Sequence, residues 1–189
     1  MGGAGDELEV KARVDDPGAL CTALASAGAA RTFQGAMIDL RFDRDNELEA
    51  RDEVIRLRIY RPRGGTPWGV LSWKGPVSTR GAYRHRREIE TQVVTPESVP
   101  ELLEHLGLSV TLRIDREIDQ WQLDGAVLRL ERYPEMDTLL EVEGEPAAIE
   151  RAMAATGLPR GAFLPESLPF FVAEYERRTG RPVRLARET

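Results

Sequence analysis

The chain has one cysteine, Cys21, and no long apolar run. A single cysteine cannot form a disulfide within the chain, and such sparse use is typical of a reducing compartment. No stretch reaches the ~20 apolar residues that a membrane-spanning helix needs. The first residues, MGGAGDELEV, also lack the basic-then-apolar pattern of a signal peptide. We therefore expect a cytoplasmic protein that does not enter a membrane, with Cys21 as a buried helical thiol.

A general nucleic-acid surface is also missing from the composition. The formal net charge is −6, whereas nucleic-acid binding normally needs a basic face. The charges are nevertheless clustered: Arg and Lys gather in RLRIYRPR and YRHRRE, and Glu gathers in ELEVK and LEVEGE. The position of each charge is therefore more informative than the total, and we expect no nucleic-acid partner.

The length of 189 residues suits one well-packed domain and is short for two. No internal repeat or linker is visible in the sequence. We expect a single domain over residues 1–189, with a flexible leader at 1–5 and a C-terminal helix and tail at 166–189. The assembly is expected to be a monomer or a homodimer.

The hydrophobic pattern predicts mostly strands. Alternation predicts eight of them, at residues 7–14, 31–45, 54–61, 68–74, 82–94, 109–121, 126–133 and 138–144. Helices are expected after Asp16, with Pro17 in the first turn, and over 96–107, 146–157 and 166–180. The glycine-rich segment 75–81 is expected to be a flexible lid. Short connections between strands predict an antiparallel α+β fold, and eight strands suit a closed barrel without exposed edges.

Several strands have one face that carries charges of both signs. The residues that share such faces are Glu7, Glu9 and Lys11; Arg56 and Arg58; Arg86, Glu88 and Glu90; Arg129 and Glu131; and Glu141 and Glu143. From alternation alone, a solvated face of an ordinary antiparallel sheet is the more common explanation. If the sheet closes, the charged faces become its lumen.

A charged lumen has a chemical consequence. Burying so many ions in a dry interior costs several kcal/mol for each ion, so the lumen must hold water or a ligand that needs both signs. Guanidinium and ammonium groups bind phosphate oxygens, and carboxylates bind hard divalent cations. A magnesium triphosphate needs both kinds of group.

Six blocks in the sequence occur in a recognisable order. They are ELEVK, IDLRFD, VIRLRIY, LSWKGP, RREIE and RLERYPEMDTLLEVEG. These blocks resemble the successive strand motifs of the CYTH domain family, which opens on an ExExK motif. Arg41 stands where the family pattern has tyrosine, and Glu131 stands where it usually has aspartate. The resemblance covers roughly residues 7–144, and the helical tail 166–180 resembles the C-terminal helix of the family more loosely.

The resemblance implies an eight-stranded triphosphate tunnel and an enzyme. Members hydrolyse inorganic triphosphate, thiamine triphosphate or nucleoside triphosphates, or cyclise ATP. It implies that the phosphates are bound by Lys11, Arg56, Arg58, Lys74, Arg86, Arg116 and Arg129. Mg²⁺ or Mn²⁺ would be held by Glu7, Glu9, Glu141 and Glu143. The catalytic set would be Lys11, Glu88, Glu90 and Glu131.

One departure from the family pattern concerns its K-x-R motif before an aromatic residue. This motif falls on Arg116-Glu117-Ile118, with Trp121 as the aromatic residue. Ile118 thus replaces one basic residue, and alternation places Arg113 on the opposite face from Arg116. A triphosphatase is the favoured function. An adenylyl cyclase, a non-catalytic polyphosphate or nucleotide sensor, and a plain scaffold remain the alternatives.

The remaining candidates have structural explanations. His85 is expected to face away from the charged side, and His105 to end a helix, where a cation is mildly favourable. The three tryptophans, Trp68, Trp73 and Trp121, are expected to pack, although one of them could stack on a base.

Overall fold

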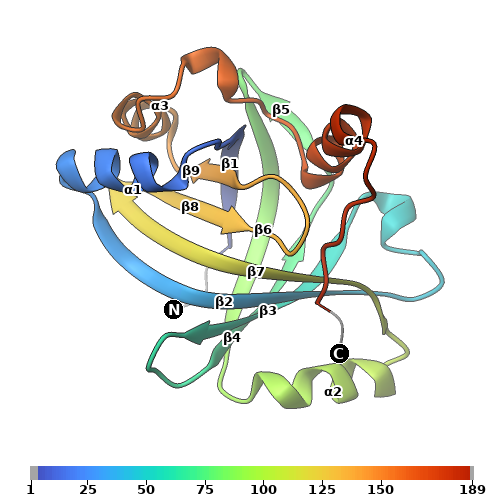
Figure 1. Cartoon of the computed structure of the whole chain (residues 1–189). Helices are drawn as coiled ribbons and strands as arrows, with labels where there is room; N and C mark the ends of the chain where they lie inside the picture. Colours follow the sequence, from blue (N-terminus) through green and yellow to red (C-terminus); the bar gives the residue numbers. More distant parts are fainter. Residues whose placement is uncertain (1–3, 188–189) are drawn as a thin grey trace.

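A computed structural model describes residues 4–187, with the side chains from residue 8 onward. Nine strands and four α-helices are present in this part of the chain (Figure 1). The strands are β1 (Ala4–Arg13), β2 (Ala30–Asp43), β3 (Val54–Pro62), β4 (Trp68–Lys74), β5 (Ser78–Arg80), β6 (Tyr83–Val93), β7 (Ser109–Leu123), β8 (Ala126–Arg132) and β9 (Leu139–Glu143). The helices are α1 (Pro17–Ser26), α2 (Val99–His105), α3 (Pro146–Ala155) and α4 (Leu168–Thr179).

Eight of these strands form a closed antiparallel barrel. The hydrogen-bonded order is β1-β9-β8-β7-β2-β3-β4-β6, and β6 pairs back onto β1. Closure pairs Glu9 with Arg84, for example, and leaves no free edge between the first and last strands of the ring. The predicted α+β class and eight-stranded barrel are therefore confirmed.

The ninth strand corrects one prediction. Segment 75–81 was expected to be a flexible lid, but Ser78–Arg80 forms β5 and pairs with the start of β6. The physical reason is a tight hairpin: Arg80 pairs with Tyr83, and Gly81 between them has φ 64°. Two-residue hairpin turns favour glycine because they need positive φ.

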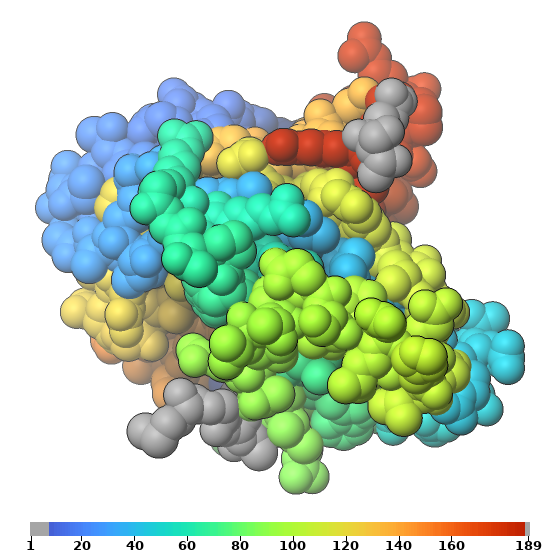
Figure 2. All heavy atoms as spheres, turned by 90° about the horizontal axis from the view of Figure 1, so that it is seen from below, coloured from blue at the N-terminus to red at the C-terminus, as the bar shows by residue number. Residues whose placement is uncertain are grey.

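Helices α1, α2 and α3 cover the aliphatic outer face of the barrel. Helices α1 and α3 contribute Leu20, Leu24, Ile149 and Met153 to the main core, over β1, β8 and β9. Helix α2 packs Leu103 against the outer side of β2 and β3. Figure 2 shows α2 from below, beside the β3–β4 hairpin. No described helix is long and apolar enough to cross a membrane.

Helix starts follow their local sequence. Asp16 caps α1 by accepting a hydrogen bond from the Ala19 backbone N–H at 2.9 Å, and Pro17 is the first helical residue. Pro169 lies in the first turn of α4, as expected. Cys21 lies in α1 but is only half-buried, which corrects the expectation of a buried thiol. Its place at the edge of the helix–barrel contact leaves one side open to solvent.

Apolar side chains narrow the barrel at both ends. At one end, Leu168 and Phe171 of α4 pack against Ile114, Tyr133 and Leu139 on the inner side of the strands. Toward the other end, a second cluster packs Met37, Tyr60 and Ile118 inside the barrel, to which Phe33 and Val70 add. Apolar clusters therefore border the polar lumen toward both ends.

The loop after β2 depends on the buried carboxylate of Asp43. Its Oδ1 accepts hydrogen bonds from the backbone N–H groups of Arg44 at 2.7 Å and Leu48 at 3.0 Å. Its Oδ2 accepts one from Glu49 at 3.0 Å. Burial alone would raise the pKa of Asp43, but these N–H donors outweigh burial and hold it below its usual value.

Asp43→Ala is expected to lower the free energy of unfolding by about 2 kcal/mol at neutral pH, because buried N–H groups lose their acceptor. The folded-state pKa is depressed, so this stabilisation is present above the ordinary carboxyl pKa of ~3.9 and is lost as pH falls through the lower folded value. Urea unfolding of both proteins from pH 7 to pH 3 measures this. The exposed Glu47→Ala is the control, and a gap that does not narrow in acid contradicts the assignment.

Candidate active site

The barrel interior is lined by charged side chains that are almost fully removed from solvent. Among the residues with described side chains, seven buried cations face inward: Lys11, Arg56, Arg58, Lys74, Arg86, Arg116 and Arg129. Six buried carboxylates line the cavities of the same interior: Glu9, Asp39, Asp43, Glu88, Glu131 and Glu141. Each is at most 9% exposed. Strand alternation explains this separation, because the intervening residues are the aliphatic ones under the helices.

Two cavities occupy the lumen. The larger has a volume of ≈ 800 Å³ and opens between the β2–β3 loop, segment 75–79 and the start of α4. Of the predicted site residues, it is lined by Glu9, Lys11, Arg56, Arg58, Lys74, Arg86, Arg116, Glu131 and Glu141. The smaller has a volume of ≈ 290 Å³ and is lined by Glu88, Glu90, Arg129, Glu143 and again Arg58. The Glu7 side chain lies outside the described part of the structure.

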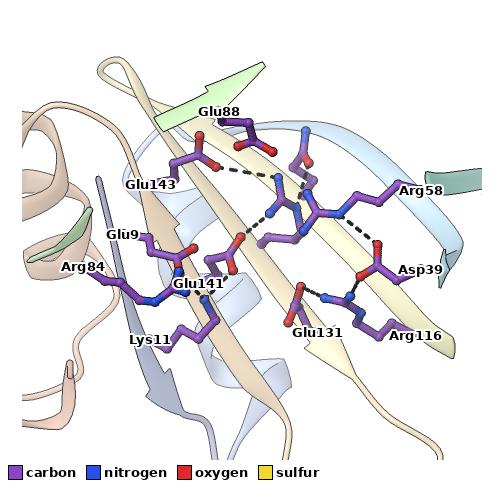
Figure 3. A network of polar contacts seen from close by, with 12 residues as sticks. Glu9, Lys11, Asp39, Arg58, Arg84, Glu88, Arg116, Glu131, Glu141 and Glu143 are labelled. Atoms are coloured by element: carbon purple, nitrogen blue, oxygen red, sulfur yellow. Dashed lines mark hydrogen bonds and ion pairs between the residues drawn. The ribbon is translucent and has the colours of Figure 1, made fainter. Parts of the chain in front are cut away.

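Lys11 lies at the centre of one charged group (Figure 3). Its Nζ is 3.0 Å from Glu9 Oε1 and 2.6 Å from Glu141 Oε2. Arg84 donates to Glu9 at 2.8 Å, and Arg129 donates to Glu141. Burial opposes the charge on Lys11, but Glu141 and Glu9 outweigh it and raise the pKa of the ammonium. Burial likewise opposes the charge on Glu141, but Lys11 and Arg129 hold its pKa well below the usual range.

A second charged group is organised by Arg116. Its guanidinium lies between Glu131, 2.6 Å from Oε1, and Asp39 (Figure 3). Asp39 also accepts a hydrogen bond from Arg58 at 3.1 Å. The hydroxyl of Tyr133 donates to the other oxygen of Glu131 at 2.5 Å. Both oxygens of this fully buried carboxylate are thus occupied, which fixes the position of Arg116.

A third group surrounds Glu88 and Arg86. Glu88 accepts from Arg56 at 3.1 Å and lies 3.1 Å from Lys74 Nζ. Arg86 donates to the backbone oxygen of Gly75 at 2.5 Å and to Asp52 Oδ1 at 3.0 Å. These contacts connect the lumen to the loops that border the larger cavity.

The predicted metal ligands are only partly brought together. Glu9 and Glu141 converge on Lys11 Nζ in the larger cavity, whereas Glu143 lines the smaller one. Within the described residues, no three His, Cys, Asp or Glu side chains form a group that could hold a metal ion alone. Mg²⁺ is usually bound by one or two carboxylates together with substrate phosphates and water. The Glu9–Glu141 pair fits that mode, in which the ligand completes the coordination.

Ile118 faces the lumen but contributes no charge. It is 1% exposed and packs with Met37 and Tyr60. The position that is basic in the family pattern is therefore part of an apolar floor of the lumen. Arg113 does not replace the missing charge. It pairs with Asp115 at 3.1 Å on the outer side of β7, with its side chain 40% exposed, as alternation predicted.

Several lumen residues, Asp43 among them, were missing from the predicted site. Asp39, Arg41 and Arg84 line the larger cavity, and so does Tyr133. A sequence signal existed for each. Arg84 lies two residues before Arg86 and therefore on the same face of its strand, and the others stand in the recognised blocks. His85, by contrast, faces away and contacts Ser78 Oγ through Nδ1 at 2.7 Å, as expected.

The aromatic residues mostly pack, as predicted. Trp121 is buried, with the Arg31 guanidinium 4.5 Å from its ring centre. Trp68 stacks on Tyr60 with ring centres 4.1 Å apart, remains 38% exposed, and lines the smaller cavity.

Comparisons with solved structures show which fold this is. The chain superimposes on the PH1819 protein from Pyrococcus horikoshii with a TM-score of 0.72 and 20% identity, over 89% of this chain and 98% of that one. A candidate adenylate cyclase from Vibrio parahaemolyticus gives 0.73 and 18% identity, over 88% and 97%. HpAC1 from Hippeastrum, a candidate adenylyl cyclase with a dominant triphosphatase activity, gives 0.58 and 18% identity, over 96% and 100%.

Sequence comparisons gave no such relatives. No family model matches the chain, and no curated protein matches it. At these identities the structural similarity establishes the fold. The fold that the CYTH resemblance implied, a closed eight-stranded triphosphate-tunnel barrel with flanking helices, is confirmed.

Proposed function

We propose that the chain is a metal-dependent triphosphatase that hydrolyses inorganic triphosphate or an organic triphosphate in the larger cavity. Among the lumen side chains that the structure describes, the excess of seven buried cations over six buried carboxylates carries this proposal. A buried excess of positive charge is costly without an anion, and a triphosphate is a compact polyanion that would match it. The six ordered sequence blocks and the barrel fold support the same assignment.

The phosphate-binding role falls to the inward-facing cations. Arginine guanidinium groups make paired, charge-assisted hydrogen bonds to phosphate oxygens. In the larger cavity this set comprises Lys11, Arg56, Arg58, Lys74, Arg86 and Arg116. Each already has a carboxylate partner, so a phosphate would enter by sharing or replacing those contacts. Binding is therefore expected to rearrange ion pairs rather than the barrel.

The carboxylates would serve two purposes. Mg²⁺ or Mn²⁺ would be held by Glu9 and Glu141, together with Glu7 on β1 and Glu143 on β9. A divalent metal, when bound, neutralises charge on the phosphate oxygens and on the leaving oxygen. Glu131 holds Arg116 in place through one oxygen, and Glu88 and Glu90 would orient water in the smaller cavity, which they line. Catalysis would thus depend mainly on positioning and electrostatics.

A second candidate is cyclisation of ATP to cyclic AMP and pyrophosphate. The observation that favours it is the stacked Tyr60–Trp68 pair in the smaller cavity, which shares Arg58 with the larger one. An exposed aromatic face of this kind can stack on a nucleobase. The triphosphate site would be the same in both reactions.

The test incubates the wild-type protein with Mg²⁺ or Mn²⁺ and each of three compounds: inorganic triphosphate, thiamine triphosphate and ATP. A triphosphatase is expected to release phosphate that disappears with a chelator. Cyclic AMP and pyrophosphate from ATP would identify the cyclase instead.

Calorimetric titration under the same conditions separates catalysis from binding alone. A protein that binds triphosphate but forms no product would be the non-catalytic sensor. Absence of both binding and product with all three compounds would disprove the proposed function.

A further inference from the structure

Arg41 is unlike the other cations of the lumen. It lines the larger cavity, yet it makes no ion pair with any residue whose side chain is described. The side chain is half-buried, and its Nε is buried without a hydrogen-bond partner, as is the Nε of Arg116. All the other arginines and lysines that line this cavity contact a carboxylate. A buried donor without an acceptor is costly, so this position has a cost that the protein alone does not offset.

The surroundings of Arg41 increase that cost. In the β2–β3 ladder Arg41 lies directly opposite Arg56, and like charges in that position are destabilising. Burial, followed by the charges of Arg56, Arg86, Arg58 and Arg84, lowers the pKa of Arg41 to about 10. Arg41 thus lies among several like charges in the lumen.

The backbone directs Arg41 toward this place. The β2–β7 ladder shifts register between Arg41 and Phe42, which leaves Thr111 on β7 without a partner. Such bulges re-aim side chains and occur near the rims of barrels and beside active sites. Thr111 and Leu112, which faces Arg41, also line the larger cavity. The irregularity therefore lies against the same space as the guanidinium.

Structural roles for Arg41 find no support in its contacts. A buried arginine that stabilises a fold normally pairs with a carboxylate or lies over an aromatic ring. The cation–aromatic contacts among the described residues belong to Arg31, Arg116 and Arg178. What remains is an anion in the cavity that would satisfy Arg41 and reduce its repulsion with Arg56.

We propose that Arg41 is a specificity-determining residue that binds a phosphoryl group of the substrate, at the rim side of the larger cavity. This inference rests on the proposed function, because it assumes a polyphosphate in that cavity. It also explains how the chain binds phosphates although Ile118 occupies a position that is basic in the family pattern. Ile118 packs beside Met37 at the floor, and Arg41 lies four residues from Met37 on the same strand, about 13 Å away.

The phosphate site is therefore displaced from the floor toward the rim. A longer phosphate chain reaches the rim better than a shorter one. Arg41 should accordingly contribute more to the binding of inorganic triphosphate than to the binding of pyrophosphate.

Calorimetric titration of the full chain with inorganic triphosphate and with pyrophosphate tests this. Arg41→Met is expected to weaken triphosphate binding about tenfold and to weaken pyrophosphate binding less. Arg41→Lys, which keeps the charge, should recover most of the affinity. Arg61→Met removes an exposed arginine from the outer side of β3 and is expected to leave both affinities unchanged.

Thermal unfolding without ligand distinguishes this role from a structural one, because the two roles predict opposite changes in Tm. Arg41→Met should melt at or above the wild-type Tm, since the repulsion with Arg56 is removed, and should gain less Tm from triphosphate. A lower Tm with unchanged triphosphate affinity would overturn the inference and leave the proposed function standing. Wild-type protein that binds no triphosphate would disprove both the inference and the proposed function.

Discussion

Glu141→Gln is expected to reduce triphosphate hydrolysis about 100-fold or more, because it removes one of the two carboxylates that converge at the centre of the larger cavity. It should also lower the free energy of unfolding by about 3–5 kcal/mol. Glu141 is 4% exposed and contacts both Lys11 and Arg129. Without its charge, two buried cations lose an anion. Phosphate release and urea unfolding measure the two effects.

Glu143→Gln is the matched control for the loss of stability alone, because Glu143 is itself a proposed metal ligand. Glu143 lies two residues further along β9, lines the smaller cavity, and has a side chain that is 33% exposed. Because its contact with Arg129 is long, at 4.0 Å, and partly solvated, the stability change should stay below about 1 kcal/mol. Equal losses of unfolding free energy in the two variants would contradict the importance given to the Lys11 group.

Arg116→Met is expected to cost a similar amount, about 3–5 kcal/mol of unfolding free energy. Arg116 is 6% exposed and is held by Asp39 and Glu131. Removing the guanidinium leaves two buried carboxylates facing each other without a cation between them. Chemical unfolding of the variant measures the loss, and retention of the wild-type midpoint would show that the ion pairs contribute little.

A double-mutant cycle identifies the source of that loss. Glu131→Gln removes one of the stranded carboxylates, so Arg116→Met combined with Glu131→Gln should be less destabilised than the sum of the single variants. Tyr133 can still donate to the remaining amide oxygen, which limits the disturbance. Strict additivity would mean that Arg116 and Glu131 are not coupled, against the geometry.

The barrel could be predicted from the sequence because its signal is local. Residues such as Glu9, Arg58 and Glu141 alternate with aliphatic neighbours, and alternation determines which side chains share a face. The inward positions of Arg86 and Arg129 follow from the same rule. Segment 78–80 was missed because its pairing with β6 depends on the turn at Gly81 rather than on its own hydrophobic pattern.

The internal arrangement of the lumen could not be predicted in the same way. Alternation places Glu143 and Glu141 on one face but cannot show that a layer containing Arg58 and Arg129 divides the lumen into two cavities. Nor can it show that Ile118 meets Met37 from another strand. These facts depend on contacts across the barrel between residues distant in sequence.

The closure of the ring by β1 and β6 also affects how the chain acquires its structure. Glu9 and Arg84, which close it, are 75 residues apart in sequence. During synthesis β1 is made before β6 and β9, so its backbone hydrogen-bonding groups stay unpaired until those strands are available. Unpaired strands of this kind are prone to aggregate. Contacts of this range also slow folding. Assembly of the barrel is therefore expected to be a late, cooperative step, and extensions placed before β1 should impair the yield of folded protein more than extensions placed after α4.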